Sequence, residues 1–154
     1  MKIALASDHA GYAQKERLKT LLQEIGVEFE DLGTESEDSV DYPDYAAKVA
    51  QAVTSGCAEQ GLLVCGSGIG MAITANKVRG IRAALVWSEE TARLARQHND
   101  ANVLAIGART TPPDVISKIV RAWFATNFDG GRHAARVEKI RQIELATEAQ
   151  RHRG

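Results

Sequence analysis

Short apolar runs alternate with segments of helical periodicity along the chain. The apolar runs have the length of β-strands and cover residues 2–7, 27–33, 61–66, 81–87 and 102–108. Between them, apolar residues recur at helical spacing, and helices are expected at 14–25, 44–53, from about residue 69, at 89–98 and up to residue 124. The pattern predicts five strands, each followed by a helix.

Residues that start and stop helices fall at the ends of these segments. Gly26 is a natural stop for the first helix, and Asp41 or Asp44 is expected to cap the second. Ser88 is the expected cap of the helix at 89–98, and a Thr-Thr-Pro-Pro sequence at 110–113 introduces the next. The strand and helix assignments are therefore supported by independent signals.

The strict alternation predicts an α/β fold with a parallel sheet and helices on both faces. The runs at 2–7, 61–66, 81–87 and 102–108 are apolar on both faces, as buried parallel strands are. In such sheets, ligands bind beyond the carboxyl ends of the strands, near the point where the strand order reverses. Functional residues are therefore sought at the strand exits.

The length of 154 residues suits a single domain, expected over 1–154. The tail from residue 132 to about 150 is expected to be helical, with a narrow apolar stripe that suits a contact with a partner subunit as well as one with its own domain. The acidic stretch at 33–45 is expected to be an ordinary loop.

Composition narrows the function classes. The net charge of −1 and the 25% charged residues argue against a nucleic-acid or membrane-surface protein. The N-terminus does not have the pattern of a signal peptide, so a cytoplasmic location with Cys57 and Cys65 as free thiols is expected. The four histidines lack the spacing of a metal site, and neither a metal nor another cofactor is expected.

The exit of the third strand reads Cys-Gly-Ser-Gly-Ile-Gly at residues 65–70. Glycines allow backbone N–H groups to converge on an anion, and the start of a helix adds partial positive charge. The same field favours the thiolate form of a nearby cysteine. The stretch can therefore supply both a base or nucleophile and an oxyanion hole, although Cys65 could also be a small buried residue at a tight turn.

Other polar residues occupy compatible places. Asp8 and His9 follow the first strand, where the alternative role of Asp8 is helix capping. His98 ends the fourth helix, a position that also suits a favourable interaction with the helix dipole. Arg132 and Arg136 lie four residues apart after a glycine pair, which suits a phosphate grip or a solvated helix face. Arg109, at the exit of the fifth strand, is a further candidate.

Five motifs, taken in order, resemble the ribose-5-phosphate isomerase type B family, which includes allose- and galactose-6-phosphate isomerases. They are SDHAG, CGSGIGM, ANKVRGIRAAL, ARQHNDANVLAIGAR and GGRHAARVEKI, and the match spans residues 1 to about 145. The resemblance implies a Rossmann-like αβα sandwich with a five-stranded parallel sheet. It also implies an aldose–ketose isomerase that acts as a homodimer or homotetramer, with active sites across a dimer interface.

The resemblance also implies roles for individual residues. Cys65 resembles the base that moves a proton between C1 and C2 through a cis-enediolate, and Ser67 the hydroxyl that assists proton transfer between the two oxygens. His98 resembles the residue that opens the furanose ring. Many members have threonine at position 67, and serine keeps the hydroxyl. Another branch has a glutamate base at the position of Met71, so Cys65 is the candidate base in this motif.

The remaining implied roles concern substrate binding. Asp8 and Asn99 resemble residues that hold sugar hydroxyls. The implied anion hole consists of Gly66, Gly68, Ile69 and Gly70, together with Ser67. The implied phosphate ligands, some of them from the neighbouring subunit, are His9, Arg109, Arg132 and Arg136.

Several activities remain open at this level. A slightly deeper pocket of the same design would accept a six-carbon sugar phosphate. A thiol phosphatase also places a cysteine before an anion-binding loop, but it needs an arginine that closes the loop, and residues 71–75 contain none. A non-catalytic anion-binding module would need only the fold, and it would leave Cys65 and His98 without a role.

Overall fold

A five-stranded parallel sheet forms the centre of the computed structural model, which describes residues 1–153. Gly154, the last residue of the expected domain, lies outside the described residues. The strands are β1 Lys2–Ser7, β2 Glu28–Asp31, β3 Gln60–Cys65, β4 Ala83–Leu85 and β5 Val103–Gly107. They are hydrogen-bonded in the order β2-β1-β3-β5-β4, and every pair is parallel, as expected.

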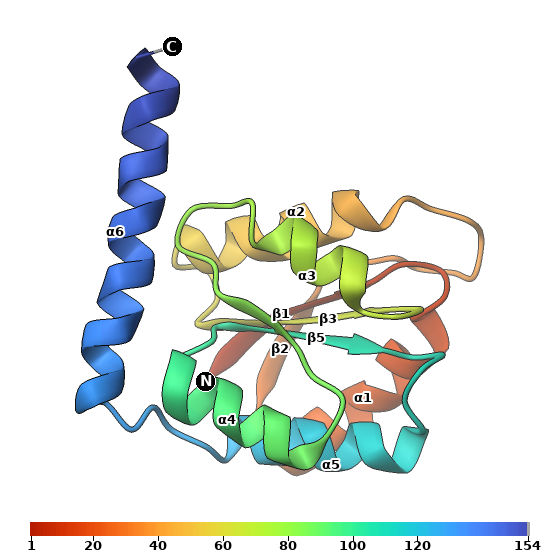
Figure 1. Ribbon diagram of the computed structural model, residues 1–154. Coiled ribbons are helices and arrows are strands. Elements are labelled where there is room, and N and C mark those ends of the chain that lie inside the picture. Colours follow the sequence, from red (N-terminus) through yellow and green to blue (C-terminus); the bar gives the residue numbers. More distant parts are fainter. Residues whose placement is uncertain (154) are drawn as a thin grey trace.

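Helices cover both faces of the sheet (Figure 1). α2 and α3 lie on one face, and α1, α4 and α5 lie on the other, which confirms the predicted αβα sandwich. The helices are α1 Tyr12–Glu24, α2 Tyr42–Thr54, α3 Ile69–Ala75, α4 Glu89–Asn99, α5 Pro113–Phe124 and α6 Arg132–Arg153.

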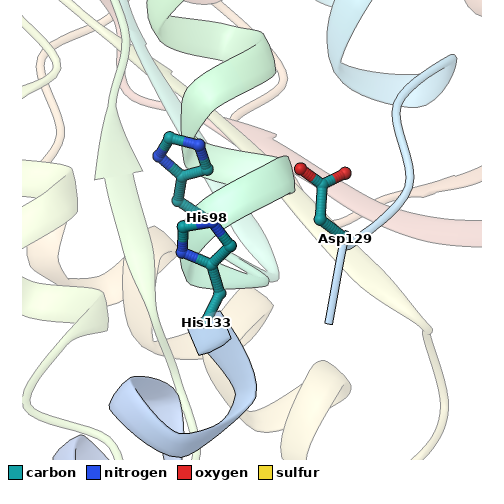
Figure 2. A group of neighbouring side chains, drawn as sticks. All are labelled: His98, Asp129 and His133. Atoms are coloured by element: carbon teal, nitrogen blue, oxygen red, sulfur yellow. The ribbon is translucent and has the colours of Figure 1, made fainter. Parts of the chain in front are cut away.

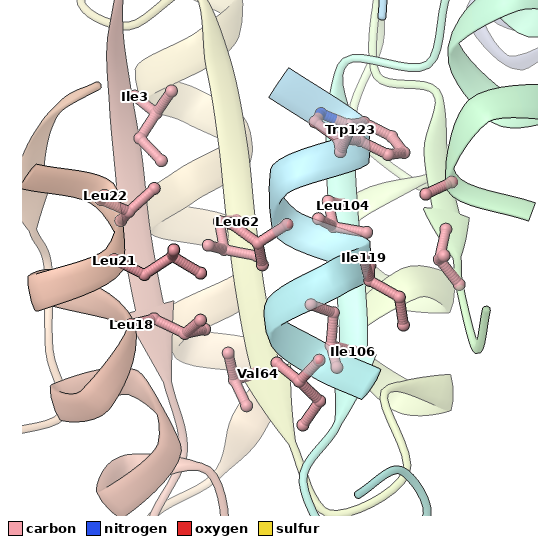
Figure 3. Close-up of a cluster of buried hydrophobic side chains, with 14 of the residues drawn as sticks. Ile3, Leu18, Leu21, Leu22, Leu62, Val64, Leu104, Ile106, Ile119 and Trp123 are labelled. Carbon is pink, nitrogen blue, oxygen red and sulfur yellow. The ribbon is translucent and has the colours of Figure 1, made fainter. Parts of the chain in front are cut away.

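The core lies on both sides of the sheet because side chains alternate along each buried strand. Leu62 and Val64 pack with Trp123 and the apolar faces of α1 and α5 (Figure 3). Leu63 and Cys65 point to the opposite face, where they pack under α2 and α3. The Trp123 indole Nε1–H donates to Gln60 Oε1 at 2.7 Å, which satisfies a polar group inside the first layer.

One strand differs from the expected pattern. The run at 81–87 was expected to be buried on both faces, but β4 has only three residues and all three are half-buried. The reason is its place in the sheet: β4 is an edge strand with β5 as its single neighbour. Ser88, by contrast, caps α4 as predicted, because its hydroxyl accepts from the N–H of Thr91 at 3.1 Å.

The strand order reverses between β1 and β3, and this position determines where a ligand can bind. The chain runs from β1 outward to β2 and then crosses to β3 on the other side of β1. The loops after β1 and β3 therefore flank the switch point at the carboxyl edge of the sheet. These loops carry Asp8, His9 and the glycine-rich turn after Cys65.

α6 extends away from the sandwich (Figure 1). It is attached at its start to α4 and further along to the segment before β4, where the Gly80 N–H donates to Glu144 Oε1 at 2.8 Å. A groove of about 650 Å³ lies between α6 and this segment. Ile140 and Ile143, in the apolar stripe of α6, are 46% and 67% exposed. Across residues 1–153, no helix combines the length and the apolarity needed to span a bilayer.

Candidate active site

Cys65 ends β3, and its sulfur is enclosed by the loop that follows. The residue is 4% exposed and packs beside Met71 on the face covered by α2 and α3. The N–H of Gly68 donates to Cys65 Sγ at 3.1 Å. A backbone N–H directed at sulfur can stabilise negative charge there, which suits a cysteine that acts as a base.

The loop at 66–70 offers further donors. Ser67 Oγ accepts from the N–H of Ile69 at 3.2 Å, which leaves the hydroxyl hydrogen free to donate elsewhere. Among residues 1–153, the N–H groups of Gly66, Ser67 and Gly70 have no hydrogen-bond acceptor. Three amides and one hydroxyl are therefore available to an anion next to Cys65.

An aromatic side chain that the sequence did not single out lies against this loop. A Cβ on Gly70 would lie 2.5 Å from two ring atoms of Tyr42, so the ring occupies the space that any other residue would need. Tyr42 is 40% exposed, and its hydroxyl oxygen is 2.9 Å from the same point. The sequence signal was weak because Tyr42 lies in an acidic stretch that reads as an ordinary loop.

The loop after β1 is fixed to the end of β3. The Asp8 N–H donates to Val64 O at 3.2 Å, and Asp8 Oδ1 accepts from the N–H of Gly11 at 3.0 Å, just before α1. This bond stabilises the turn that leads into the helix, and it engages one of the two carboxylate oxygens. Asp8 is 6% exposed, so the other oxygen lies in a largely enclosed position.

His9 is oriented by a backbone hydrogen bond. The N–H of Val40 donates to His9 Nδ1 at 3.1 Å, so Nδ1 carries no proton in this arrangement. The hydrogen of the neutral imidazole is then on Nε2, where it can be donated to an oxygen of a ligand. The loop at 33–41 thus selects the tautomer of a predicted phosphate ligand.

Arg109 completes the group at this edge. Its N–H donates to Gly66 O at 2.9 Å, and its side chain crosses the glycine, with Cδ 3.5 Å from the position a Cβ would take. The structure therefore brings together five predicted residues beside the switch point, and we call them the thiol cluster. They are Asp8, His9, Cys65, Ser67 and Arg109.

The other predicted residues form a second group around the end of α4 and the start of α6. His98 and Asn99 are in the last turn of α4, and Arg132 and Arg136 are exposed on the first turns of α6. The N–H of Asp129 donates to Gln97 O at 3.1 Å, which holds the segment before α6 against α4. We call this group the imidazole cluster. It consists of His98, Asn99, Asp129, Arg132, His133 and Arg136.

The imidazole rings of His98 and His133 are stacked (Figure 2). Their centroids are 4.2 Å apart and their planes differ by 11°. The sequence suggested that the histidines were dispersed, because these two belong to different helices. The sequence did not single out His133, although it lies next to Arg132 in one of the motifs named above.

His133 is surrounded by groups that oppose its protonation. Burial lowers the pKa of the His133 imidazole, and the positive charges of His98, Arg132 and Arg136 lower it further. The Asp129 carboxylate acts in the opposite direction without offsetting them. His133 therefore stays neutral to lower pH than an ordinary histidine does.

The thiol cluster and the imidazole cluster lie at opposite edges of the sheet. α4 starts after the carboxyl end of β4 and returns to the amino edge, where Asn102 contacts both Gly61 and Arg82. β3, which separates the two edges, has six residues and spans about 17 Å. Within one chain, Cys65 and His98 are therefore too far apart to act on one small molecule.

Comparisons with known proteins agree on one family. The sequence model described as Ribose/Galactose Isomerase matches residues 3–140. Ribose-5-phosphate isomerase B of Escherichia coli is 47% identical over 143 residues, which cover 93% of this chain and 96% of the relative.

Solved structures agree as well. Ribose-5-phosphate isomerase B of Clostridium thermocellum superposes with a TM-score of 0.93 at 48% identity, covering 96% of this chain and 99% of that one. The Mycoplasma genitalium enzyme with bound ribulose-5-phosphate gives a TM-score of 0.89 at 42% identity, with 94% and 96% covered. The chain belongs to the ribose/galactose isomerase family.

Proposed function

We propose that the protein interconverts ribose 5-phosphate and ribulose 5-phosphate through a cis-enediolate, with Cys65 as the base. The relatives named for this reaction align over more than nine-tenths of the chain. The thiol cluster supplies a sulfur, backbone donors and a hydroxyl at one strand exit. Free cysteines fit a reducing compartment, and the proposed location is the cytoplasm.

The active site is completed by a second copy of the chain. Within one subunit the thiol cluster and the imidazole cluster lie at opposite edges of the sheet. In the proposed site, the thiol cluster of one subunit therefore lies beside the imidazole cluster of the other. Exposed apolar residues adjoin the thiol cluster on α3, where Ile69 and Ile73 are 51% and 57% exposed. A contact that covers these residues would bury apolar surface and exclude water from the site.

Proton transfer takes place beside the glycine-rich loop. The Cys65 thiolate removes the proton from C2 of the open-chain aldose, and the electrons of that bond form the enediolate. Free amides of the loop at 66–70 stabilise the negative oxygen. The Ser67 hydroxyl moves a proton between the two oxygens, and the cysteine returns its proton to C1, which gives the ketose.

Ring opening and orientation use the remaining residues. Ribose 5-phosphate is mostly a closed ring in water, so a proton must move between the anomeric hydroxyl and the ring oxygen before isomerisation. His98 of the second subunit carries out this transfer, and Asp8 and Asn99 hold sugar hydroxyls. Binding of the phosphate, which is far from C1 and C2, fixes the orientation of the open-chain sugar in the site. The proposed phosphate ligands are His9, Arg109, Arg132 and Arg136.

One observation carries this proposal: the hydrogen bond from the Gly68 N–H to Cys65 Sγ, made within a loop that retains three free amides. A cysteine that served only for packing would not need these donors. The arrangement provides a base and a stabilised oxyanion within one turn, as an enolisation requires.

The test is the variant Cys65→Ala. We expect turnover of ribose 5-phosphate to fall at least about 100-fold, because general-base catalysis is lost. The buried alanine should leave sugar-phosphate binding in place, as measured by calorimetry. Cys57→Ala, at the exposed cysteine, is the matched control and should keep full turnover. Unchanged turnover in Cys65→Ala would rule out Cys65 as the catalytic base.

Two other activities are distinguished by substrate and product. A kcat/KM that is a hundredfold higher for allose 6-phosphate than for ribose 5-phosphate would assign the enzyme to the hexose branch of the family. Release of inorganic phosphate would indicate a phosphatase. Exchange of carbon-bound hydrogen with deuterated solvent at C1 or C2 is the result expected of the isomerase.

A further inference from the structure

His133 is the buried residue in the exposed first turns of α6. It is 9% exposed, whereas Arg132, Ala134, Ala135 and Arg136 are all exposed. Among the residues that the structure describes, its imidazole nitrogens have no hydrogen-bond partner. Its ring stacks on the His98 ring, at a centroid distance of 4.2 Å. The buried His133 side chain therefore lies against the proposed ring-opening residue.

Backbone hydrogen bonds fix the position of the stack. The N–H of Asp129 donates to Gln97 O at 3.1 Å, one residue before His98. The N–H groups of His133 and Ala134 donate to Gly130 O and Gly131 O at 3.0 and 3.2 Å. These bonds hold the turn before α6, and with it the backbone of His133, beside the last turn of α4.

A chelated metal ion does not account for the arrangement. His98, Asp129 and His133 each offer one ligand atom, and these atoms lie within 4.8 Å of one another (Figure 2). The lone pair of an imidazole nitrogen lies in the ring plane, and the two planes are only 11° from parallel. The lone pairs therefore do not converge on one point, and the positive charges of Arg132 and Arg136 disfavour a cation nearby.

The charges around the stack limit its protonation. The charged groups that act on His133 from its surroundings are the Asp129 carboxylate and the guanidiniums of Arg132 and Arg136. Positive charge on the stacked His98 ring is one of the causes that lower the pKa of His133. A flat, neutral His133 ring is consequently a suitable support for a His98 ring that gains and loses a proton.

We propose that His133 is a positioning residue, whose ring stacks on His98 and fixes the plane in which His98 exchanges a proton with the furanose oxygen. This inference rests on the proposed ring-opening role of His98. Proton transfer depends on the direction of the donor nitrogen, so a freely rotating imidazole would be a poorer catalyst of ring opening. The later proton transfer at C1 and C2 does not depend on the stack.

Two substitutions separate stacking from the other properties of His133. His133→Phe keeps a flat ring and removes both nitrogens. His133→Leu keeps apolar volume and removes the flat ring. His133→Gln provides a second non-aromatic variant if the leucine variant does not fold. Thermal unfolding of each variant establishes that it is folded before the kinetics are compared.

The kinetic readout compares a substrate that needs ring opening with one that does not. Ribulose 5-phosphate cannot close a five-membered ring, because its O5 carries the phosphate. In His133→Leu we expect isomerisation of ribose 5-phosphate to fall about tenfold, while solvent deuterium exchange into ribulose 5-phosphate changes little. His133→Phe should retain most of the isomerisation rate. Equal losses in the Phe and Leu variants, or parallel losses of isomerisation and exchange, would overturn the proposal.

A spectroscopic readout does not depend on turnover. The ring current of a stacked neighbour shifts the His98 Hε1 proton resonance upfield. We expect that shift to persist in His133→Phe and to disappear in His133→Leu. Its absence from the unsubstituted protein would overturn the proposal even if the enzyme is active. A protein that shows the shift but does not convert ribose 5-phosphate would instead refute the proposed function and leave the stack established.

Discussion

Gly68 holds the loop between β3 and α3 in a left-handed conformation, with φ of +78°. The Gly68 N–H is the donor to Cys65 Sγ, so the conformation of this residue aims the donor at the sulfur. A Cβ at this position would lie 2.7 Å from Leu85 Cδ1 and 2.9 Å from the Ile106 carbonyl carbon. Both the backbone angle and the surroundings therefore require glycine here.

Substitution of Gly68 tests this requirement. We expect Gly68→Ala to reduce the free energy of unfolding by about 3 kcal/mol, because left-handed strain and a clash with β5 backbone add together. Gly56→Ala is the control: its φ is +83°, but nothing lies within 4 Å of the added Cβ. The free energy of unfolding of Gly56→Ala, measured with urea, should fall by only about 1 kcal/mol. Equal losses in the two variants would show that the space around Gly68 does not matter.

Residues in a continuous motif could be predicted from the sequence. Cys65 and the glycines after it are adjacent in the chain, and a strand followed by a glycine-rich turn has a known geometry. Tyr42 and His133 could not be found in this way. Their functional neighbours, Gly70 and His98, belong to other segments, and such contacts arise only when the helices pack.

At the scale of elements, Lys15 connects α1 to the loop after β2. Its side chain is fully buried, and Nζ donates to Asp31 Oδ1 at 2.7 Å and to Thr34 O at 2.9 Å. The same loop continues to Val40, which orients His9. A buried ammonium thus helps to hold the segment on which a proposed phosphate ligand depends.

This connection predicts a pH dependence of stability. Burial by itself would raise the pKa of the Asp31 carboxyl, but hydrogen bonds from Lys15, Lys19 and Gly33 outweigh it and hold that pKa below its usual range. A lowered pKa contributes stability that is present above the unfolded value of about 3.9 and is lost as the pH falls through the folded value.

Urea unfolding of Asp31→Asn between about pH 5 and pH 3 measures this contribution. The variant should be less stable than the unsubstituted protein at neutral pH. The difference between their free energies of unfolding should become smaller as the pH falls. Glu28→Gln, on the same strand, is the matched control for loss of a carboxylate. A gap that stays constant with pH would mean that the Asp31 carboxyl does not lose its contribution on acidification.

The order of the elements followed from hydrophobic periodicity, whereas the extent of one strand did not. Residues 81–87 have the composition of a buried strand, but only Ala83–Leu85 pair, because the position at the sheet edge provides one neighbour. Strand order depends on how crossovers pack, and a single sequence does not contain that information directly. The position of the switch point between β1 and β3 therefore came from the structure.

At the scale of the whole molecule, a single subunit carries two partial sites. The thiol cluster has the proposed base and the proposed oxyanion donors, and the imidazole cluster has the stacked histidines and an arginine pair. The sequence suggested both sets of residues, and the family resemblance implied a site shared between subunits. The course of α4 back to the amino edge shows which residues fall in each set. The proposed complete site therefore needs two copies, with the carboxyl edge of one beside the amino edge of the other.

The most direct test of this account mixes two inactive variants. Chains with Cys65→Ala and chains with His98→Asn are unfolded together, refolded and assayed with ribose 5-phosphate. Each mixed dimer has one site with both native side chains, so random pairing should restore about a quarter of the unsubstituted activity. A mixture of Cys65→Ala and Cys65→Ser chains, both altered in the thiol cluster, is the control and should stay inactive. Activity of the first mixture no greater than the average of its two components would contradict a site shared between subunits.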